Sequence, residues 1–145
     1  MSTTTRPLFR VIIAGSRHFS DYDTLCQKCD AALERKTQTH TIVILSGGAA
    51  GADSLGERYA KDHGYTLRRY LADWSRDGRS AGILRNTRMV SVADALIAFW
   101  DGESHGTGHI IKVSKQRGLA VRVFSITPTF QTSQYELPFS DQISD

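Results

Sequence analysis

The chain alternates between short apolar runs and longer segments in which apolar residues recur every three or four positions. The runs are rich in β-branched residues and show little polar alternation, which is typical of parallel strands that are covered on both faces. They predict strands over residues 8–14, 41–45, 66–71, 95–100 and 119–124. The segments between the runs predict helices over residues 21–35, 52–63, 79–92 and 106–117.

Signals at the helix ends support this division. Ser20, with Asp23 three residues later, is the expected N-cap of the first helix. Gly64 and Gly118 are expected to end the second and fourth helices in a left-handed conformation. Strands joined by helical crossovers form right-handed βαβ units. The pattern therefore predicts an α/β fold, with a Rossmann-like, doubly wound, mainly parallel sheet of about five strands and helices on both faces.

Length and composition are those of one globular domain. The chain has 145 residues, of which 40% are hydrophobic, and its net charge is +3. We expect a nucleotide-binding domain over residues 1–126 and a peripheral or partly disordered tail over residues 127–145, where Ser, Thr, Gln and Pro are frequent. No stretch approaches the roughly 18 apolar residues of a membrane helix, and the first residues lack the apolar centre of a signal peptide. A soluble cytoplasmic protein without a membrane partner is expected.

The two cysteines form a C-x-x-C pair, a spacing that also occurs in redox and zinc sites. Cys26 and Cys29 fall in the middle of the first predicted helix, and the nearest histidine, His40, stands alone. We therefore interpret them as part of a buried apolar helix face in a reducing compartment. No metal site is expected.

Loops of small residues directly follow three of the predicted strands. They are residues 15–17 (GSR), 46–53 (SGGAAGAD) and 101–108 (DGESHGTG). Ligands of open α/β sheets bind at the carboxyl ends of the strands, so the three loops should converge on one rim. Glycine lets the backbone approach a ligand, and the helices that follow present free N–H groups to anions. The sequence therefore predicts a site for a phosphate-bearing ligand.

Two common nucleotide-binding motifs are missing from the sequence. No Gly-Lys-Ser or Gly-Lys-Thr occurs, and no G-x-G-x-x-G follows the first strand with an acidic residue about 20 positions on. ATP hydrolysis at a Walker loop and NAD-dependent hydride transfer are therefore disfavoured. The candidate ligand-binding residues are Gly15, Ser16, Arg17, Gly47, Gly48, Ala49, Gly51, Asp53, Arg85, Asn86, Gly106 and Thr107.

Several of these side chains allow more than one role. Arg17 follows a strand end and can fork onto phosphate oxygens, or it can pair with Asp53 or Asp101. Asp53 can cap its helix and close the loop, or accept a hydrogen bond from a ribose hydroxyl. Thr107 can cap the last helix while its hydroxyl contacts phosphate.

The helix over residues 79–92 adds further candidates. Asn86 lies within an apolar stripe, where a buried amide either ties down a neighbouring loop or contacts ligand. Arg85 can reach the rim, whereas Arg88 is expected to be a solvated surface charge. Trp74 lies in a long polar connection between a strand and a helix, where it can stack on a nucleobase or pack ordinarily.

The chain resembles the SLOG superfamily, specifically the small stand-alone branch related to YspA and YpsA. The matching segments are residues 11–17 (VIIAGSR), 46–53 (SGGAAGAD), 81–86 (AGILRN) and 93–102 (ADALIAFWDG), with Gly106 and Thr107 after them. The resemblance implies a Rossmann-like sheet whose glycine loops hold nucleotides or nucleotide-derived molecules such as ADP-ribose. It also implies a homo-oligomer, because relatives in bacteria and phages commonly pair through helices beside the sheet.

Three related groups imply different functions. The LONELY GUY phosphoribohydrolases carry P-G-G-x-G-T-x-x-E, and Ile110 stands here at the position of the glutamate, so hydrolysis would need another acid such as Asp101 or Glu103. The DNA processing protein A family binds single-stranded DNA, for which the basic-aromatic cluster at residues 68–70 is the candidate. Sensor modules of conflict systems bind nucleotide-derived signals without transforming them.

Binding without catalysis is the leading interpretation, with nucleotide hydrolysis and single-strand nucleic-acid binding as the alternatives. The expected partner is a nucleotide-derived small molecule, and nucleic acid is the less favoured partner. No cofactor is required, and the sequence does not indicate whether Mg²⁺ accompanies the phosphate.

Overall fold

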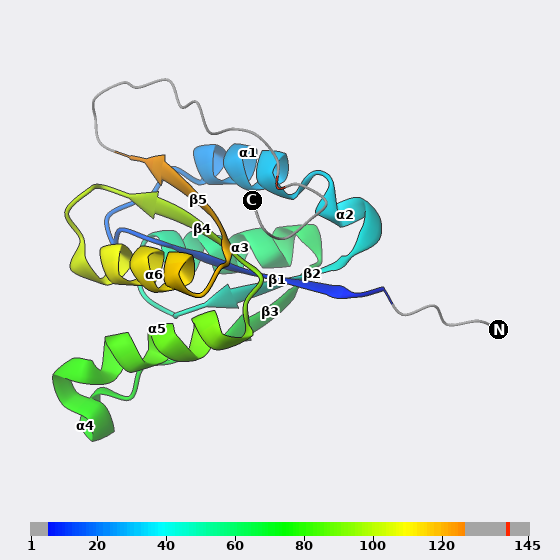
Figure 1. Cartoon of the computed structure of the whole chain (residues 1–145). Helices are drawn as coiled ribbons and strands as arrows, with labels where there is room; N and C mark the ends of the chain where they lie inside the picture. The colour runs from blue at the N-terminus through cyan, green and yellow to red at the C-terminus, as the bar shows by residue number, and fades with distance from the viewer. Residues whose placement is uncertain (1–5, 127–138, 140–145) are drawn as a thin grey trace.

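The computed structural model describes residues 6–126 and Phe139. Within these residues the fold is a parallel sheet with strand order β3-β2-β1-β4-β5 (Figure 1). The strands are β1 (Leu8–Gly15), β2 (Thr41–Ser46), β3 (Thr66–Arg69), β4 (Ala95–Trp100) and β5 (Ala120–Ser125). After β1, the strands β2 and β3 are added on one side of it. The chain then returns to the other side of β1, where β4 and β5 are added, so the strand order reverses between β1 and β4. This arrangement confirms the predicted doubly wound α/β fold.

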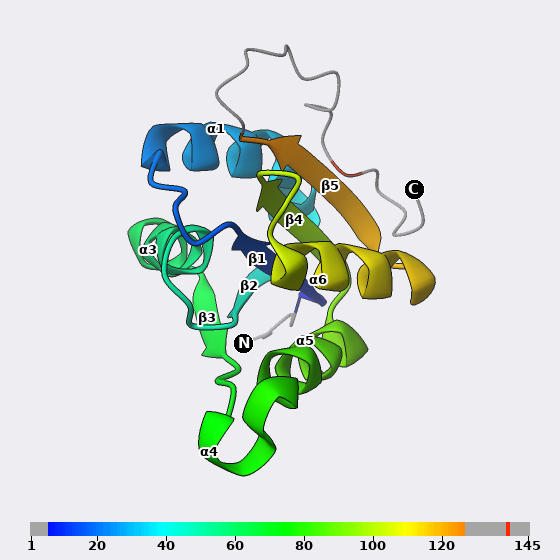
Figure 2. The ribbon, with the colours of Figure 1, turned by 90° about the vertical axis from the view of Figure 1, so that its left-hand side faces the viewer.

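Helices cover both faces of the sheet (Figure 2). The helices are α1 (Tyr22–Leu33), α2 (Lys36–Thr39), α3 (Ala52–His63), α4 (Trp74–Asp77), the 3₁₀ helix η1 (Gly78–Ser80), α5 (Ala81–Val92) and α6 (His105–Gln116). Alternate residues of β1 point to opposite cores: Val11 and Ile13 pack with α1 and α3, whereas Ile12 packs with α5 and α6. The near-continuous apolar strands of the sequence reflect these two cores.

The ends of several elements differ from the sequence-based prediction. Asp21, not Ser20, is the N-cap of α1, because its carboxylate accepts hydrogen bonds from the N–H and the hydroxyl of Thr24 at 3.0 and 2.6 Å. The single helix predicted over residues 21–35 ends at Leu33, and α2 follows as a separate turn. The helix predicted over residues 79–92 begins instead with η1.

The third strand is shorter and more exposed than predicted. It ends at Arg69 instead of residue 71, and Thr66, Arg68 and Arg69 are exposed. β3 pairs only with β2 among the described strands, so it is an edge strand with one open side. The prediction that this run is covered on both faces was therefore wrong. The predicted left-handed helix ends at Gly64 and Gly118 are confirmed, with φ of 70° and 79°.

The cysteines and the chain ends complete the fold. Cys26 and Cys29 are free thiols on α1, and Cys29 is fully buried, which confirms their interpretation as an apolar helix face. The tail predicted over residues 127–145 lies outside the described residues except for Phe139, which packs against Phe9. Over residues 6–126, no helix combines the length and apolarity that crossing a membrane requires.

Candidate ligand-binding site

The loops after β1, β2 and β4 meet at one end of the sheet, as the sequence predicted. Ser16 N–H donates to Phe99 O at 2.9 Å, and Ala52 N–H donates to Ser16 O at 3.2 Å. Gly51 has φ of 77°, and a Cβ there would lie 2.3 Å from Ser16 O. A Cβ on Gly15 would lie 2.2 Å from Phe99 O. Gly15 and Gly51 are therefore required for the loops to pack against each other.

A cavity of about 350 Å³ lies at this meeting point. It opens where the strand order reverses, between the ends of β1 and β4, and it is bounded by α5 and by the first turn of α6. Its lining residues are Ala14, Gly15, Arg17, His18, Ala49, Asp53, Arg85, Asn86, Met89, Ser104, His105, Gly106, Thr107 and Ile110. Eight of the twelve predicted ligand-binding residues are among them.

The N-terminus of α6 opens into this cavity. Its N-cap, Ser104, makes no side-chain capping bond, and the first bond of the helix runs from Gly108 N–H to Ser104 O at 3.0 Å. The N–H groups of His105, Gly106 and Thr107 therefore have no helical partner. Such N–H groups, together with the helix dipole, attract anions.

Thr107 adds a hydroxyl beside these N–H groups. Its side chain is only 6% exposed and lines the cavity, and its hydroxyl has no hydrogen-bond partner within the described residues. Because buried hydroxyls are normally hydrogen-bonded, this hydroxyl is available to a ligand. The predicted capping role of Thr107 was wrong, since Ser104 occupies the N-cap position.

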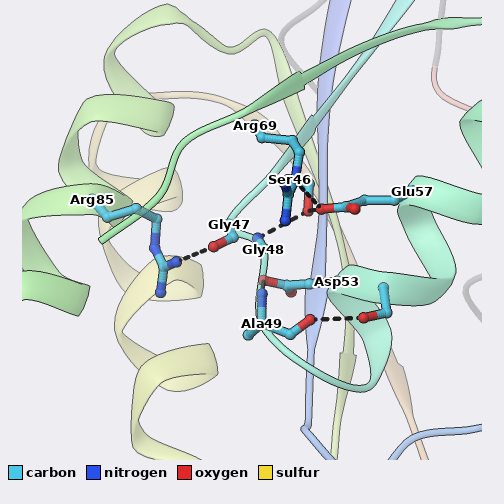
Figure 3. Close-up of polar contacts among 9 residues, drawn as sticks. Ser46, Gly47, Gly48, Ala49, Asp53, Glu57, Arg69 and Arg85 are labelled. Atoms are coloured by element: carbon cyan, nitrogen blue, oxygen red, sulfur yellow. Dashed lines mark hydrogen bonds and ion pairs between the residues drawn. The ribbon is translucent and has the colours of Figure 1, made fainter. Parts of the chain in front are cut away.

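Arg85 brings a guanidinium to the cavity from α5 (Figure 3). Its Nη1 donates to Gly47 O at 2.5 Å, and its Nε donates to the side-chain oxygen of Asn86 at 2.9 Å. Burial lowers the pKa of Arg85, whereas the nearby Asp53 raises it, and an arginine remains charged in any case. The remaining N–H groups of this fixed guanidinium can bind an anion.

Asn86 connects two helices of the site. Its amide nitrogen donates to Gly106 O and lies equally close to His109 Nδ1, both at 3.3 Å, while its oxygen accepts from Arg85. The buried amide therefore positions Arg85 against the first turn of α6. The sequence left open whether Asn86 ties down a neighbouring loop or contacts ligand. The structure shows the first of these roles, because Asn86 donates to Gly106 O in the first turn of α6.

The loop between β2 and α3 is held by the protein's own polar groups (Figure 3). Gly48 N–H donates to Ser46 Oγ at 3.0 Å, and Ser46 in turn donates to Glu57 at 2.7 Å. Ala49 N–H donates to Asp53 Oδ2 at 3.2 Å. These two N–H groups are therefore already satisfied, whereas the first three N–H groups of α6 have no hydrogen bond within the described residues.

Asp53 lies at the cavity wall and is 7% exposed. Burial raises the pKa of its carboxyl, while the hydrogen bond from Ala49 and the charges of Arg85 and Arg17 lower it. The N-cap of α3 is Gly51, so Asp53 closes the loop without being the cap. Only its Oδ2 has a hydrogen-bond partner within the described residues.

Arg17 and Ser16 are neighbours in the chain, but their exposure to solvent and their hydrogen bonds differ. Arg17 is exposed, lines the cavity and forms no ion pair within residues 6–126, so the predicted pairing with Asp53 or Asp101 is not found. Ser16 is buried; its Oγ lies 3.2 Å from Ser104 Oγ and accepts from Asp101 N–H. Ser16 therefore joins the β1 and β4 loops, whereas Arg17 is available to a ligand.

A second cavity of about 410 Å³ adjoins the first. The two cavities share Arg17, Ala49 and Arg85, and the second one extends over Gly47 and Gly48. Its outer wall consists of the apolar residues that follow β3: Leu71, Ala72 and Trp74. Trp74 is 56% exposed at the start of α4, so its ring is open to solvent beside the two guanidiniums.

The two weak catalytic candidates do not line either cavity. Asp101 Oδ1 accepts hydrogen bonds from the N–H groups of Ser104 and Glu103, both at 2.8 Å, and these bonds lower the pKa of Asp101 to about 2. Asp101 therefore shapes the turn before α6. Within the described residues, no cluster of three His, Cys, Asp or Glu side chains suits a metal ion.

Two histidines of the cavity were missed in the sequence. His18 and His105 both line it. Each stands beside a predicted residue, His18 after Arg17 and His105 before Gly106, and this adjacency was the available signal. Ile110, which replaces the glutamate of the phosphoribohydrolase motif, is buried at the cavity floor and packs with Met89.

Comparison with known proteins gives a family match and a phage relative. The model of the YspA, cpYpsA-related SLOG family matches residues 9–76, which include the loop between β2 and α3. The Gene 61 protein of Mycobacterium phage D29 is 36% identical over 125 residues, which cover 82% of this chain and 98% of that protein.

Solved structures share the fold at low identity. DNA processing protein A from Streptococcus pneumoniae superposes with a TM-score of 0.62 at 17% identity, over 81% of this chain and 50% of that chain. The chain therefore spans half of that protein. The protein TM1055 gives a TM-score of 0.56 at 18% identity, over 78% and 72% of the two chains. The Moco carrier protein from Chlamydomonas reinhardtii gives 0.51 at 14% identity, over 85% and 78%. The match to the family model and the phage relative together show that the chain belongs to the YspA, cpYpsA-related SLOG family.

Proposed function

We propose that the protein binds a nucleotide or a nucleotide-derived small molecule, with a phosphate at the N-terminus of α6. The observation that carries this proposal is the uncapped first turn of α6, which faces a cavity that also contains the unpartnered hydroxyl of Thr107. Arg17 and Arg85 line the same cavity and supply positive charge. Free N–H groups, a hydroxyl and guanidiniums together form a phosphate site.

The second cavity supports a ligand that is larger than a phosphate. Trp74 offers an open aromatic ring on which a nucleobase can stack, and Leu71 offers apolar surface beside it. The cavities, of about 350 and 410 Å³, are joined at Arg17 and Arg85. A ligand such as ADP-ribose, with phosphates between two sugar or base groups, fits this arrangement.

Binding without transformation is the form of this function that the residues favour. Ile110 occupies the position of the hydrolase glutamate and is 2% exposed in the apolar core. Asp101 is held ionised with a pKa of about 2, so it has no proton to donate near neutral pH. We therefore propose that the protein senses or sequesters its ligand.

Isothermal titration calorimetry tests the proposal directly. AMP, ADP-ribose, cyclic ADP-ribose isomers and NAD are titrated into the wild-type protein, and at least one is expected to bind more tightly than about 1 mM. Arg85→Ala is expected to weaken binding about 10-fold or more. Arg79→Ala, which removes an exposed charge outside both cavities, is the matched control. Binding weaker than millimolar for every compound would contradict the proposal.

Nucleotide hydrolysis is a second candidate because one observation favours it. Asp53 is the carboxylate among the lining residues, and burial raises its pKa, as in general acids. A hydrolase that uses Asp53 would convert AMP slowly to base and ribose phosphate, and Asp53→Asn would abolish the turnover. Unchanged AMP after prolonged incubation with the wild-type protein would leave binding as the function.

A further inference from the structure

The phosphate-binding cavity contains a carboxylate that a site for phosphate alone would not need. Its basic lining residues are Arg17, His18, Arg85 and His105, and its acidic lining residue is Asp53. A carboxylate repels a bound anion, and the repulsion is strongest where water is excluded. Asp53 therefore lowers the affinity for bare phosphate unless the ligand brings a hydrogen-bond donor to it.

Asp53 has one carboxylate oxygen to offer to a ligand. Its Oδ2 is fixed by Ala49 N–H at 3.2 Å, and no hydrogen bond reaches its Oδ1 from any described residue. The side chain is more than nine-tenths buried, and it lines the cavity. A carboxylate oxygen that has no protein partner can accept from a ligand donor, and hydrogen bonds to charged groups are stronger than those between neutral groups.

The Asp53 carboxylate lies close to the guanidinium that is expected to hold phosphate. A Cβ on Gly47 would lie 2.6 Å from Arg85 Nη1 and 2.9 Å from Asp53 Oδ2, so both groups reach the same point. They do not form an ion pair within the described residues, and both line the same cavity. A hydroxyl and a phosphate oxygen of one ligand can therefore contact Asp53 and Arg85 together.

We infer that Asp53 is a specificity-determining residue that accepts a hydrogen bond from a sugar hydroxyl, so that the site selects phosphorylated pentoses with free ring hydroxyls. This inference rests on the proposed function. It assigns the ligand class as ribose phosphates, including ribonucleotides, against deoxyribose phosphates and inorganic phosphate. It also explains why an acidic residue lies among the basic groups of the cavity.

Calorimetry with matched analogues tests the inference. AMP, 2′-deoxy-AMP, 3′-deoxy-AMP and inorganic phosphate are titrated into the wild-type protein and into Asp53→Asn. The wild-type protein is expected to bind AMP about 10-fold more tightly than at least one deoxy analogue, because a ligand without the hydroxyl leaves the carboxylate unpaired. Asparagine can still accept from Ala49 N–H through its amide oxygen, so the loop is expected to remain closed.

Asp53→Asn is also expected to change the affinity for inorganic phosphate, which a residue with a purely structural role would not do. Asp53→Asn removes the negative charge, so the affinity for inorganic phosphate is expected to rise about 3-fold or more while the preference for AMP falls. Equal or weaker binding of AMP relative to both deoxy analogues in the wild-type protein would overturn the inference. A preference that survives intact in Asp53→Asn would overturn the assignment to Asp53.

These outcomes are distinguishable from a failure of the proposed function. If ADP-ribose or NAD binds but the hydroxyl preference is absent, the proposed function stands and the inference fails. If none of the nucleotides binds, the proposed function itself fails. The titrations of the wild-type protein with nucleotides and their deoxy analogues distinguish these outcomes even if Asp53→Asn does not fold.

Discussion

Gly47 shows how one missing side chain shapes the site. Its place is occupied from both sides, by Arg85 Nη1 and by Asp53 Oδ2. The sequence predicted that glycines here let the backbone approach a ligand, but Gly47 also makes room for two side chains of the proposed ligand site. Sequence periodicity could not reveal this role, because Arg85 and Asp53 come from different helices, α5 and α3.

Gly47→Ala is expected to weaken nucleotide binding about 5-fold or more while leaving the fold intact. The added Cβ displaces the flexible ends of Arg85 and Asp53, which can move without a backbone shift. Calorimetry measures the affinity, and thermal unfolding checks the stability. Gly82→Ala is the control for displacement of Arg85, because a Cβ there also lies near Trp74 and Arg85 but only at van der Waals distances of 3.6 and 3.8 Å. Wild-type affinity in Gly47→Ala would contradict the placement of the ligand.

Thr107→Val removes the unpartnered hydroxyl and keeps the shape of the side chain. The free energy of unfolding is expected to change by less than about 0.5 kcal/mol, because no protein hydrogen bond is lost. Nucleotide binding is expected to weaken by about 1 kcal/mol, roughly 5-fold. Thr87→Val, which removes a hydroxyl bonded to Ile83 O outside the cavities, is the control for binding. If both variants bind equally well, Thr107 does not contact the ligand.

At the scale of elements, the strands and main helices followed from the sequence, whereas their ends did not. The apolar runs of β1, β2 and β4 are buried on both sides, so their pattern is unambiguous. β3 contains two exposed arginines and lies at the sheet edge, and it ends at Arg69 although the apolar pattern predicted a strand to residue 71. The short helix α4 has no buried residue, so no hydrophobic periodicity could predict it.

The turn before α6 depends on Asp101, which gives a pH-dependent prediction. Hydrogen bonds from Ser104 and Glu103 lower the pKa of Asp101 from 3.8 to about 2, so the folded state binds this proton less tightly than the unfolded state. The stabilisation is present above the unfolded value and is lost as pH falls through the folded value. Asp101→Asn is therefore expected to be less stable than the wild-type protein at neutral pH.

Urea unfolding at several pH values checks this difference. The gap in the free energy of unfolding between the two proteins should narrow as pH falls from 3.8 towards 2. Glu103→Gln, whose side chain makes no hydrogen bond within the described residues, is the charge-matched control. A gap that stays constant with pH would contradict the role of the Asp101 carboxylate.

At the scale of the whole molecule, the reversal of strand order beside β1 determines where the candidate ligand-binding site lies. The sequence located this end of the sheet from its small-residue loops, but it could not tell which helix N-terminus is free. That distinction depends on tertiary hydrogen bonds, such as the bond from Ala49 N–H to Asp53. Asp53 accepts from Ala49 N–H before α3, and Ser16 O accepts from Ala52 N–H in its first turn, whereas the first three N–H groups of α6 have no hydrogen bond within the described residues.

We propose that the protein forms homo-oligomers through the outer surface of α5, where Ile83, Leu84 and Val92 are exposed apolar residues. Native mass spectrometry is expected to show a mass that is a multiple of the monomer. Leu84→Glu should reduce this mass to that of the monomer, whereas Gln38→Glu on α2 should leave it unchanged. A monomeric wild-type protein would contradict the proposal.

Phosphate is proposed to bind at the N-terminus of α6, and amide-resolved NMR of the ¹⁵N-labelled protein tests this placement most directly. On titration with AMP, the largest changes in amide chemical shift are expected at His105, Gly106 and Thr107, whose N–H groups are free. Smaller changes are expected at Gly48 and Ala49, whose N–H groups are already bonded. Changes centred on Gly48 and Ala49, or no change at α6, would contradict the account.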